Sequence, residues 1–512
     1  MTAPVQRVRA RWIVEGFAAD GDPIIHENAA LTIADGKVLA IGPVAALRDA
    51  HPDAPEIGDA DSVVIPGLIN AHHHVGLTPL QLGSPDHPLE LWFASRLALR
   101  DVDPYLDTLY SAFEMIASGV TTVQHLHSRA PGDADQIVGT AGRVIDAYRD
   151  IGMRASYSMA LRDQNRLVYA DDAEFAASVP PDVQPSLRDY FKRFTLPLDE
   201  QCAIYEALRA KAGGRIAVQL APANLHWLSD RALERAAALS KRDRTPMHIH
   251  LVETMYQKAY AKKRTGGTAL EHLHRFGLTG PLLTAGHSTW MTESDIELCA
   301  HTGTRICHNC SSNLRLKSGV APLNRFLAKG IRVGLGMDEA GINDDRDMLQ
   351  EMRMALRLHR EPGLDAPHPS PAQILRMATE FGADTTPFGA SIGRLHPGCE
   401  ADLVLFDWNR VTYPYQNDAI PPIDVLVQRA RGDAIARVMI AGQTVYADGK
   451  FAKMDRAAIL AEIAARLRQP LTPAETARID LAKAVFPYVK EFYDGYLDGT
   501  GTNPHYRVSG RE

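Results

Sequence analysis

The segment Val63-Val64-Ile65-Pro66-Gly67-Leu68-Ile69-Asn70-Ala71 leads directly into His72-His73-His74. Its apolar run has the composition of a buried β-strand. Side chains at positions i and i+2 of an extended chain point the same way, so His72 and His74 can converge on one metal ion. The segment therefore predicts a buried strand that ends in half of a metal site.

Three later apolar segments also end in groups that bind metals or transfer protons. The run at 246–251 contains His250 and is followed by Glu253. The run at 282–286 is followed by His287, and the run at 331–337 is followed by Asp338. Any one of these residues could be structural in a chain with 20 histidines, and His125 and His127 form a similar pair. The ordered series at strand ends nevertheless predicts an active site, because parallel barrels keep their active sites at the carboxyl ends of their strands.

Apolar strands alternate with helical stretches through the middle of the chain, which is typical of a parallel α/β sheet. Eight strands are expected, at 63–70, 121–125, 154–158, 216–221, 246–251, 282–287, 304–308 and 331–337. Eight is the number that a closed (β/α)₈ TIM-like barrel requires, and we assign it to residues 65–389. An open doubly wound sheet is the alternative, but no glycine-rich phosphate loop follows the first strand.

Short strands with turn signals occupy both ends of this region. Asp35-Gly36 predicts a hairpin between strands near 30–33 and 37–41. A similar pattern of short strands and turns recurs at 401–406 and 436–446. Each piece has too few strands for a sandwich of its own, so we expect residues 1–64 and 390–455 to form one small composite β-sandwich domain. Residues 456–512 are predicted to be a helical extension, with an aromatic face at Phe492, Tyr493 and Tyr496 that packs on the barrel or on a second subunit. Residues 161–198 are expected to be a loop, either a lid or a tolerated insertion.

The bulk composition is that of a soluble globular enzyme. Charged residues make up 23% of the 512 residues, and the net charge of −7 offers no general attraction for nucleic acid or an anionic membrane. No apolar run long enough to span a bilayer and no signal-like segment is apparent, so a cytoplasmic location is expected. Five cysteines make a disulfide framework improbable, and we interpret Cys307-His308-Asn309-Cys310 as a strand end with two incidental thiols.

Three histidines and a carboxylate form a ligand set suited to one Zn²⁺, with Fe²⁺ or Mn²⁺ as alternatives. Such an ion activates water for attack on a carbon atom. Glu253 can then donate a proton to the substrate, while His287 holds the nucleophile or stabilises charge and Asp338 accepts the proton of the water. The fourth strand, at 215–222, contains no lysine that could be carboxylated to bridge a second ion.

Several motifs resemble the amidohydrolase superfamily, in its branch of guanine, cytosine and S-adenosylhomocysteine deaminases and triazine hydrolases. The resemblance runs from about residue 10 to 451 and is carried by the motifs at 66–74, 250–254, 286–291, 312–319, 336–338 and 392–403. It implies metal binding by His72, His74, His250 and Asp338, with Glu253, His287 and Asp338 catalytic. The chain departs from the branch at Cys310, where proline is usual, and at Leu82, where several relatives have arginine. Relatives are often homo-oligomers, so a dimer or tetramer is expected.

The loops after the strands supply the candidate substrate contacts. Gln81 and Trp92 resemble positions that hold or stack on a flat heterocycle, and Gln164, Asn224, His226 and His287 add polar groups. The leading hypothesis is an aminohydrolase that displaces ammonia or a similar leaving group from a C=N carbon of a purine, pyrimidine or triazine. Ring opening of a cyclic amide, such as an imidazolone or hydantoin, is the alternative. A non-catalytic barrel scaffold is disfavoured, because such proteins typically lose metal ligands and none is missing here.

Overall fold

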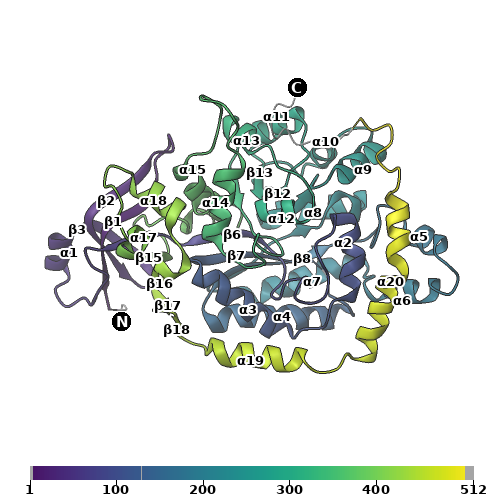
Figure 1. The fold of residues 1–512 in the computed structure, drawn as a ribbon, viewed down its shortest axis with the longest axis horizontal. Helices are drawn as coiled ribbons and strands as arrows, with labels where there is room; N and C mark the ends of the chain where they lie inside the picture. The colour runs from purple at the N-terminus through teal and green to yellow at the C-terminus, as the bar shows by residue number, and fades with distance from the viewer. Residues whose placement is uncertain (1–3, 129, 502–512) are drawn as a thin grey trace.

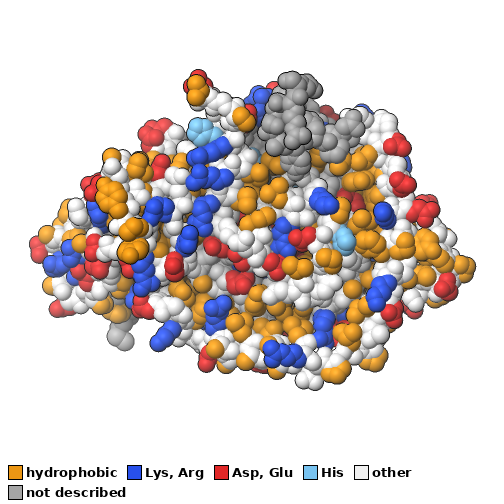
Figure 2. Space-filling view, viewed as in Figure 1, with side chains coloured by type: hydrophobic (Ala, Val, Ile, Leu, Met, Phe, Trp, Pro, Cys, Tyr) orange, Lys and Arg blue, Asp and Glu red, His pale blue; other side chains and the backbone are white. Residues whose placement is uncertain are grey.

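The computed structural model describes residues 4–128 and 130–501 (Figure 1). A twisted β-sheet lies at one end of the molecule, on the left in Figure 1, and parallel strands surrounded by helices fill the centre. Lys and Arg side chains are interspersed with Asp and Glu over the face seen in Figure 2. No helix in the described part of the chain combines the length and the apolar character needed to cross a membrane.

The sheet at the end of the molecule contains nine strands from both ends of the chain. Their order is β18-β17-β16-β15-β5-β1-β2-β3, with β4 beside β1. The bounds are β1 Gln6–Phe17, β2 Pro23–Ala34, β3 Lys37–Pro43, β4 Glu56–Ile57, β5 Ser62–Pro66, β15 Leu403–Asp407, β16 Ile435–Ile440, β17 Gln443–Ala447 and β18 Lys450–Phe451. The predicted hairpin at Asp35-Gly36 is confirmed, since both residues have positive φ between the antiparallel strands β2 and β3. The nine strands form one sheet, and the expected two-layered sandwich stays a prediction.

The parallel strands form two sheets. One has the order β10-β8-β7-β6, with β9 beside β8, and the other has the order β11-β12-β13-β14. Single-residue bridges join them at both sides, between Leu220 and Met247 and between His73 and Asp338. The bounds are β6 Leu68–His73, β7 Val120–His127, β8 Arg154–Leu161, β9 Ile216–Val218, β10 Ala221–Pro222, β11 Met247–Leu251, β12 Leu283–His287, β13 Arg305–His308 and β14 Val333–Leu335.

The strand predicted at 63–70 is in fact two strands, which is a correction to the sequence analysis. β5 pairs with β1 and β15 in the nine-stranded sheet, whereas β6 pairs with β7 in the parallel sheet. Gly67 separates them, and a Cβ atom there would collide with the side chain of Thr121. The close approach of the two backbones therefore requires glycine at the crossing point.

Helices follow the parallel strands, as expected for an α/β fold. Ser229 is the N-cap of α8, because its hydroxyl accepts a hydrogen bond from the amide of Ala232 in the first turn of the helix. The helices of this region are α3 Pro104–Ala117, α4 Ala134–Ile151, α7 Leu198–Ala210, α8 Asp230–Asp243, α9 Met255–Thr265, α10 Ala269–Arg275, α11 Glu293–Thr302, α12 Cys310–Arg315, α13 Leu323–Ala328, α14 Met348–Leu358, α15 Pro371–Met377 and α16 Glu380–Asp384. The described residues also include α1 Val44–Ala50, α17 Trp408–Thr412, α18 Pro422–Arg429 and four 3₁₀ turns, at Arg96–Ala98, Leu225–Trp227, Gly389–Ser391 and Gly432–Ala434.

The segment 161–198 is not a simple loop, contrary to the prediction. It contains α5 Asp172–Ser178 and α6 Gln184–Arg193, which pack with α2 Leu89–Ser95 and with the C-terminal helix α20 Pro473–Tyr493 (Figure 1). Leu187 and Val485 are completely buried in this cluster. Tyr493 also belongs to it, so the aromatic face of the tail packs on the body of the same chain. The preceding helix, α19 Arg456–Leu467, lies against α3.

Candidate active site

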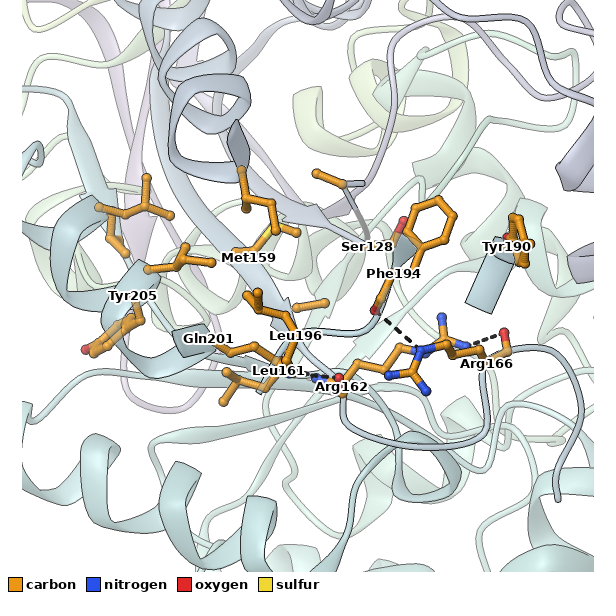
Figure 3. A pocket seen from close by; sticks show the side chains of 16 residues that line it. Ser128, Met159, Leu161, Arg162, Arg166, Tyr190, Phe194, Leu196, Gln201 and Tyr205 are labelled. Carbon is orange, nitrogen blue, oxygen red and sulfur yellow. Dashed lines mark hydrogen bonds between the residues drawn. The ribbon is translucent and has the colours of Figure 1, made fainter. Parts of the chain in front are cut away.

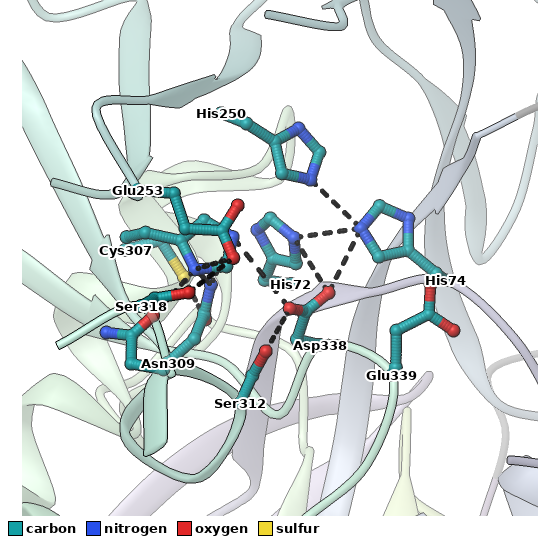
Figure 4. A network of polar contacts seen from close by, with 12 residues as sticks. His72, His74, His250, Glu253, Cys307, Asn309, Ser312, Ser318, Asp338 and Glu339 are labelled. Carbon is teal, nitrogen blue, oxygen red and sulfur yellow. Dashed lines mark hydrogen bonds and ion pairs between the residues drawn. The ribbon is translucent and has the colours of Figure 1, made fainter. Parts of the chain in front are cut away.

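Four of the predicted ligands meet at the carboxyl ends of the parallel strands (Figure 4). His72 and His74 come from the end of β6, His250 from β11 and Asp338 from the turn after β14. His74 Nε2 lies 3.0 Å from both His72 Nε2 and His250 Nε2. Asp338 Oδ1 lies 3.1 Å from His74 Nε2 and 3.4 Å from His72 Nε2. One donor atom from each of the four residues thus faces a common centre.

Hydrogen bonds on the far side of the rings orient the imidazoles. His74 Nδ1 lies 2.5 Å from the carbonyl oxygen of Leu126, and His250 Nδ1 lies 2.9 Å from that of Ala223. A carbonyl can only accept, so both Nδ1 atoms carry the proton and both Nε2 lone pairs face the centre. This is the second-sphere arrangement that prepares histidine for a metal, and with the carboxylate it makes a set of donors that fits a divalent ion.

The electrostatics agree with this interpretation. Burial lowers the pKa of His72 and His250 well below the usual range, so both rings are neutral as metal binding requires. Burial also acts to lower the pKa of His74, but the Asp338 carboxylate outweighs it and the net shift is upward. Burial alone would raise the pKa of Asp338, yet its close contacts with the His72 and His74 rings hold it well below its usual range. Asp338 therefore presents a carboxylate to the centre.

The backbone at the strand ends is strained in order to direct these side chains. Val252, His287 and Asp338 have φ angles of 41°, 64° and 54°, in the left-handed region that residues other than glycine rarely adopt. Such strain is concentrated at functional sites in proteins. Close packing contributes as well, because a Cβ atom on Gly336 would lie 2.5 Å from the Cβ of His72.

Glu253 and His287 lie beside the four ligands. The Glu253 carboxylate accepts a hydrogen bond of 3.2 Å from the hydroxyl of Ser318, and its Oε1 is 3.7 Å from His287 Nδ1. His287 Nδ1 also lies 2.9 Å from Asn313 Oδ1, and its Nε2 is 3.8 Å from Asp338 Oδ2. Burial, with the nearby charges of Asp338 and Glu90, raises the pKa of Glu253 well above its ordinary range. A buried carboxyl group with a raised pKa is suited to proton donation.

The structure brings only some of the predicted substrate residues to this centre. Trp92 and Asn224 line the same cleft as His74, Glu253 and Asp338. Gln81 is exposed, where it accepts from the Thr78 amide and donates to Tyr110, and Gln164 donates to the backbone of His226 and Leu228. The His226 ring is buried against Tyr169, with 4.1 Å between ring centres. The side chains of Gln81 and Gln164 are thus engaged by these loop contacts, and the His226 ring is packed among aromatic side chains.

One face of α2 contributes residues that the sequence analysis did not identify. Phe93 and Arg96 line the cleft, with Leu89 and Trp92 on the same face of the helix and its following turn. Positions 89, 92, 93 and 96 have the spacing of a single helical face, so the sequence alone could have indicated that these side chains lie together. The guanidinium of Arg96 lies 4.4 Å above the Trp92 ring and is 3.0 Å from the Glu339 carboxylate.

A largely apolar cavity continues from the cleft between β8 and the helices α4 and α7 (Figure 3). Ser128, Arg162 and Arg166 line both this cavity and the space beside His74 and His250. Its remaining wall is mostly hydrophobic and includes Met159, Leu161, Tyr190, Phe194, Leu196 and Tyr205. Tyr190, Phe194 and Leu196 belong to segment 161–198, which therefore shapes a cavity next to the candidate active site.

Comparisons with known proteins define the class. The amidohydrolase family matches residues 63–445, so the chain belongs to the amidohydrolase family. It is similar to 5-methylthioadenosine/S-adenosylhomocysteine deaminase of Nitratidesulfovibrio vulgaris strain Miyazaki F, with 31% identity over 86% of this chain and 92% of the relative. A zinc-bound adenosine deaminase from Xanthomonas campestris has a similar structure, with a TM-score of 0.75 and 25% identity over 90% of this chain and 98% of the other.

A third comparison supports the fold alone. Atrazine chlorohydrolase from Arthrobacter aurescens has a TM-score of 0.77 at 21% identity, over 90% of this chain and 99% of the other. The resemblance inferred from the sequence motifs is confirmed, and the protein is an amidohydrolase, a metal-dependent hydrolase of C–N bonds other than peptide bonds.

Proposed function

We propose that this protein is a deaminase that uses one divalent ion, Zn²⁺ in the first instance, to replace an amino group on a purine-type heterocycle with water. The observation that carries the proposal is the convergence of His72, His74, His250 and Asp338 beside Glu253, a buried carboxyl group whose pKa is raised. The zinc in the similar adenosine deaminase supports the choice of ion. Fe²⁺ and Mn²⁺ remain alternatives, because availability as much as affinity selects among such ions.

His72, His74, His250 and Asp338 would hold the ion. When bound, a divalent ion of this kind lets a water molecule ionise near neutral pH. Asp338 would accept the proton released by the water, because its carboxylate is ionised. Its Oδ2 atom lies 3.8 Å from His287 Nε2. Glu253 donates a proton to the ring nitrogen of the substrate that becomes electron-rich as water adds to the adjacent carbon. His287, fixed by Asn313, stabilises the charge that develops beside it.

The walls of the cleft favour a flat substrate with an apolar substituent. Trp92, Phe93 and Trp227 line it, and aromatic side chains of this kind stack on heterocycles. The similar deaminase is named for 5-methylthioadenosine and for S-adenosylhomocysteine, and the methylthio group of the first is small and apolar. The apolar cavity beside Arg162 could receive such a group (Figure 3). We therefore propose an adenosine-type nucleoside that is modified on its sugar.

Finer features of the architecture belong to the same proposal. We propose that the two parallel sheets act as one closed eight-stranded barrel at residues 65–389, supported by the bridges at Leu220 and His73. Residues 1–64 and 390–455 would form the composite domain, supported by the pairing of β5 with β15. The helical extension at 456–512, the homo-oligomer and the cytoplasmic location stay predictions.

A substrate screen tests the proposal. Purified protein loaded with zinc is incubated with adenosine, 5-methylthioadenosine, guanine, pyrimidines, triazines and hydantoins, and ammonia, ultraviolet absorbance and product mass are recorded. Deamination of an adenosine-type nucleoside with release of ammonia is expected. Addition of water to a cyclic amide without release of ammonia would instead establish ring opening. Absence of turnover on every compound, in protein with full metal content, would contradict the proposal.

A further inference from the structure

Three more metal-binding side chains meet in the interior behind the candidate active site. They are His308 at the end of β13, Cys310 at the start of α12 and His359 at the C-terminus of α14. His308 Nε2 lies 2.8 Å from His359 Nε2 and 2.8 Å from the Cys310 sulfur. His308 and Cys310 are inaccessible to solvent and His359 is only 6% exposed. None of the three belongs to the ligand set described above.

Hydrogen bonding alone does not satisfy this cluster. A single ring nitrogen offers either one lone pair or one N–H group, but His308 Nε2 has two polar neighbours at bonding distance. Only one of these contacts can therefore be a well-directed hydrogen bond. The other nitrogen of the ring, Nδ1, is buried with no hydrogen-bond partner among the described residues. The polar contacts of the His308 ring are therefore made by Nε2, which faces both His359 and Cys310.

We propose that His308, Cys310 and His359 bind a second metal ion, a thiophilic divalent cation such as Zn²⁺. A cation among the three donors can interact with all of them at once, which a proton cannot. Two imidazoles and one thiolate are among the commonest ligands of zinc in proteins. His308 Nε2 lies as close to the other two donors as His74 Nε2 lies to His72 Nε2 in the first site, where the distance is 3.0 Å. This revises the interpretation of Cys310 as an incidental thiol.

The proposed second metal site lies next to the turn that positions residues in contact with His287 and Asp338. The turn from His308 to Cys310 leads into α12, which carries Ser312 and Asn313. The Ser312 hydroxyl donates to Asp338 Oδ2 at 2.5 Å, and Asn313 Oδ1 accepts a hydrogen bond from His287 Nδ1 at 2.9 Å. An ion that fixes His308 and Cys310 would hold this turn in place. It would thereby position the groups that orient His287 and Asp338, without itself touching the substrate.

Cobalt spectroscopy tests the proposal without reference to activity. The metal-free protein is titrated with Co²⁺, and the near-ultraviolet absorption of a cobalt–thiolate bond is followed. The first site has no sulfur ligand, so such absorption reports on a cysteine site alone. Thiolate absorption and two ions per chain are expected for the wild type. Cys310→Ser should lose the absorption and one ion, and His359→Gln should lower the affinity of the same site.

Two cysteine variants serve as controls. Cys202→Ser removes a buried thiol from α7 that has no part in any of the clusters, and it should retain the absorption. Cys307→Ser should retain it too, although Cys307 lies near His72 and His248. Absence of thiolate absorption in the wild type would overturn the proposal, and this result does not depend on the folding of a variant. Loss of the absorption in Cys307→Ser but not in Cys310→Ser would also overturn it.

Discussion

Replacement of Glu253 by glutamine separates proton transfer from every other role of the site. Glutamine keeps the volume of the side chain and an oxygen that can accept the hydrogen bond from Ser318, which is 3.2 Å in the wild type. Burial raises the pKa of Glu253 and so favours its neutral form, which glutamine reproduces in size and charge. We therefore expect Glu253→Gln to fold normally and to retain its metal.

The size of the kinetic effect follows from what else could donate the proton. A positioned acid or base contributes about 10²–10⁴-fold to rate. Glu253 is only 3% exposed, so bulk water cannot readily replace it, and His287 is already engaged with Asn313. The upper part of the range is therefore expected, a loss of about 10³-fold or more in kcat, which corresponds to about 4 kcal/mol in the barrier.

The assay is steady-state deamination measured together with metal content and thermal unfolding. Glu380→Gln is a matched control, because it also removes a buried carboxylate, but one that accepts from the Phe17 amide and pairs with Arg376 rather than facing the centre. Its kcat should change by less than about tenfold. Turnover by Glu253→Gln near the wild-type rate, with full metal content, would refute the proton-transfer role.

Three further changes test the site and its surroundings. Asp338→Ala should lose activity and most of its bound metal, as measured by elemental analysis after dialysis; full retention of the ion would remove Asp338 from the ligand set. Gly336→Ala should lower the free energy of unfolding by about 1–3 kcal/mol through crowding against His72, whereas Gly139→Ala, in open space on α4, should be neutral or stabilising in the same melts. Burial raises the pKa of Glu351 to about 7. Between about pH 4.5 and 7 the folded state therefore keeps a proton that the unfolded state loses, so this carboxyl group makes the free energy of unfolding fall as the pH rises through that window. Glu351→Gln should show a smaller fall over that window in denaturant titrations, and an unchanged pH dependence would contradict the raised pKa.

Much of the site could be predicted from the sequence because its ligands mark strand ends. The alternation of apolar strands with helices placed His72, His250, His287 and Asp338 at one edge of a parallel arrangement, and the structure brings all of them to that edge. The hydrophobic periods of strands, two residues, and of helices, 3.6 residues, depend only on nearby positions, so they can be recognised in a single sequence. The face of α2 that holds Trp92 and Arg96 carried the same kind of signal.

Other features depend on contacts that no local pattern encodes. The break between β5 and β6 is set by packing of Gly67 on Thr121, not by the run of apolar residues, which continues through it. The pairing of His72 Nδ1 with His248 joins residues 176 positions apart. Gln81 and Gln164 were plausible substrate contacts by composition, but their hydrogen bonds to nearby loops are visible only in the folded chain.

The position of β5 between β1 and β15 has a consequence for biosynthesis. β5 runs through Gly67 into β6, so the strand that presents His72 and His74 is anchored next to a partner, beginning at Leu403, that is translated much later. Pairings of such long sequence separation form late, because the chain entropy must be lost before the contacts are gained. A nascent chain still lacking Leu403 would therefore leave this edge open on the ribosome. Premature termination should consequently yield fragments that chaperones and proteases recognise, and not a partly active enzyme.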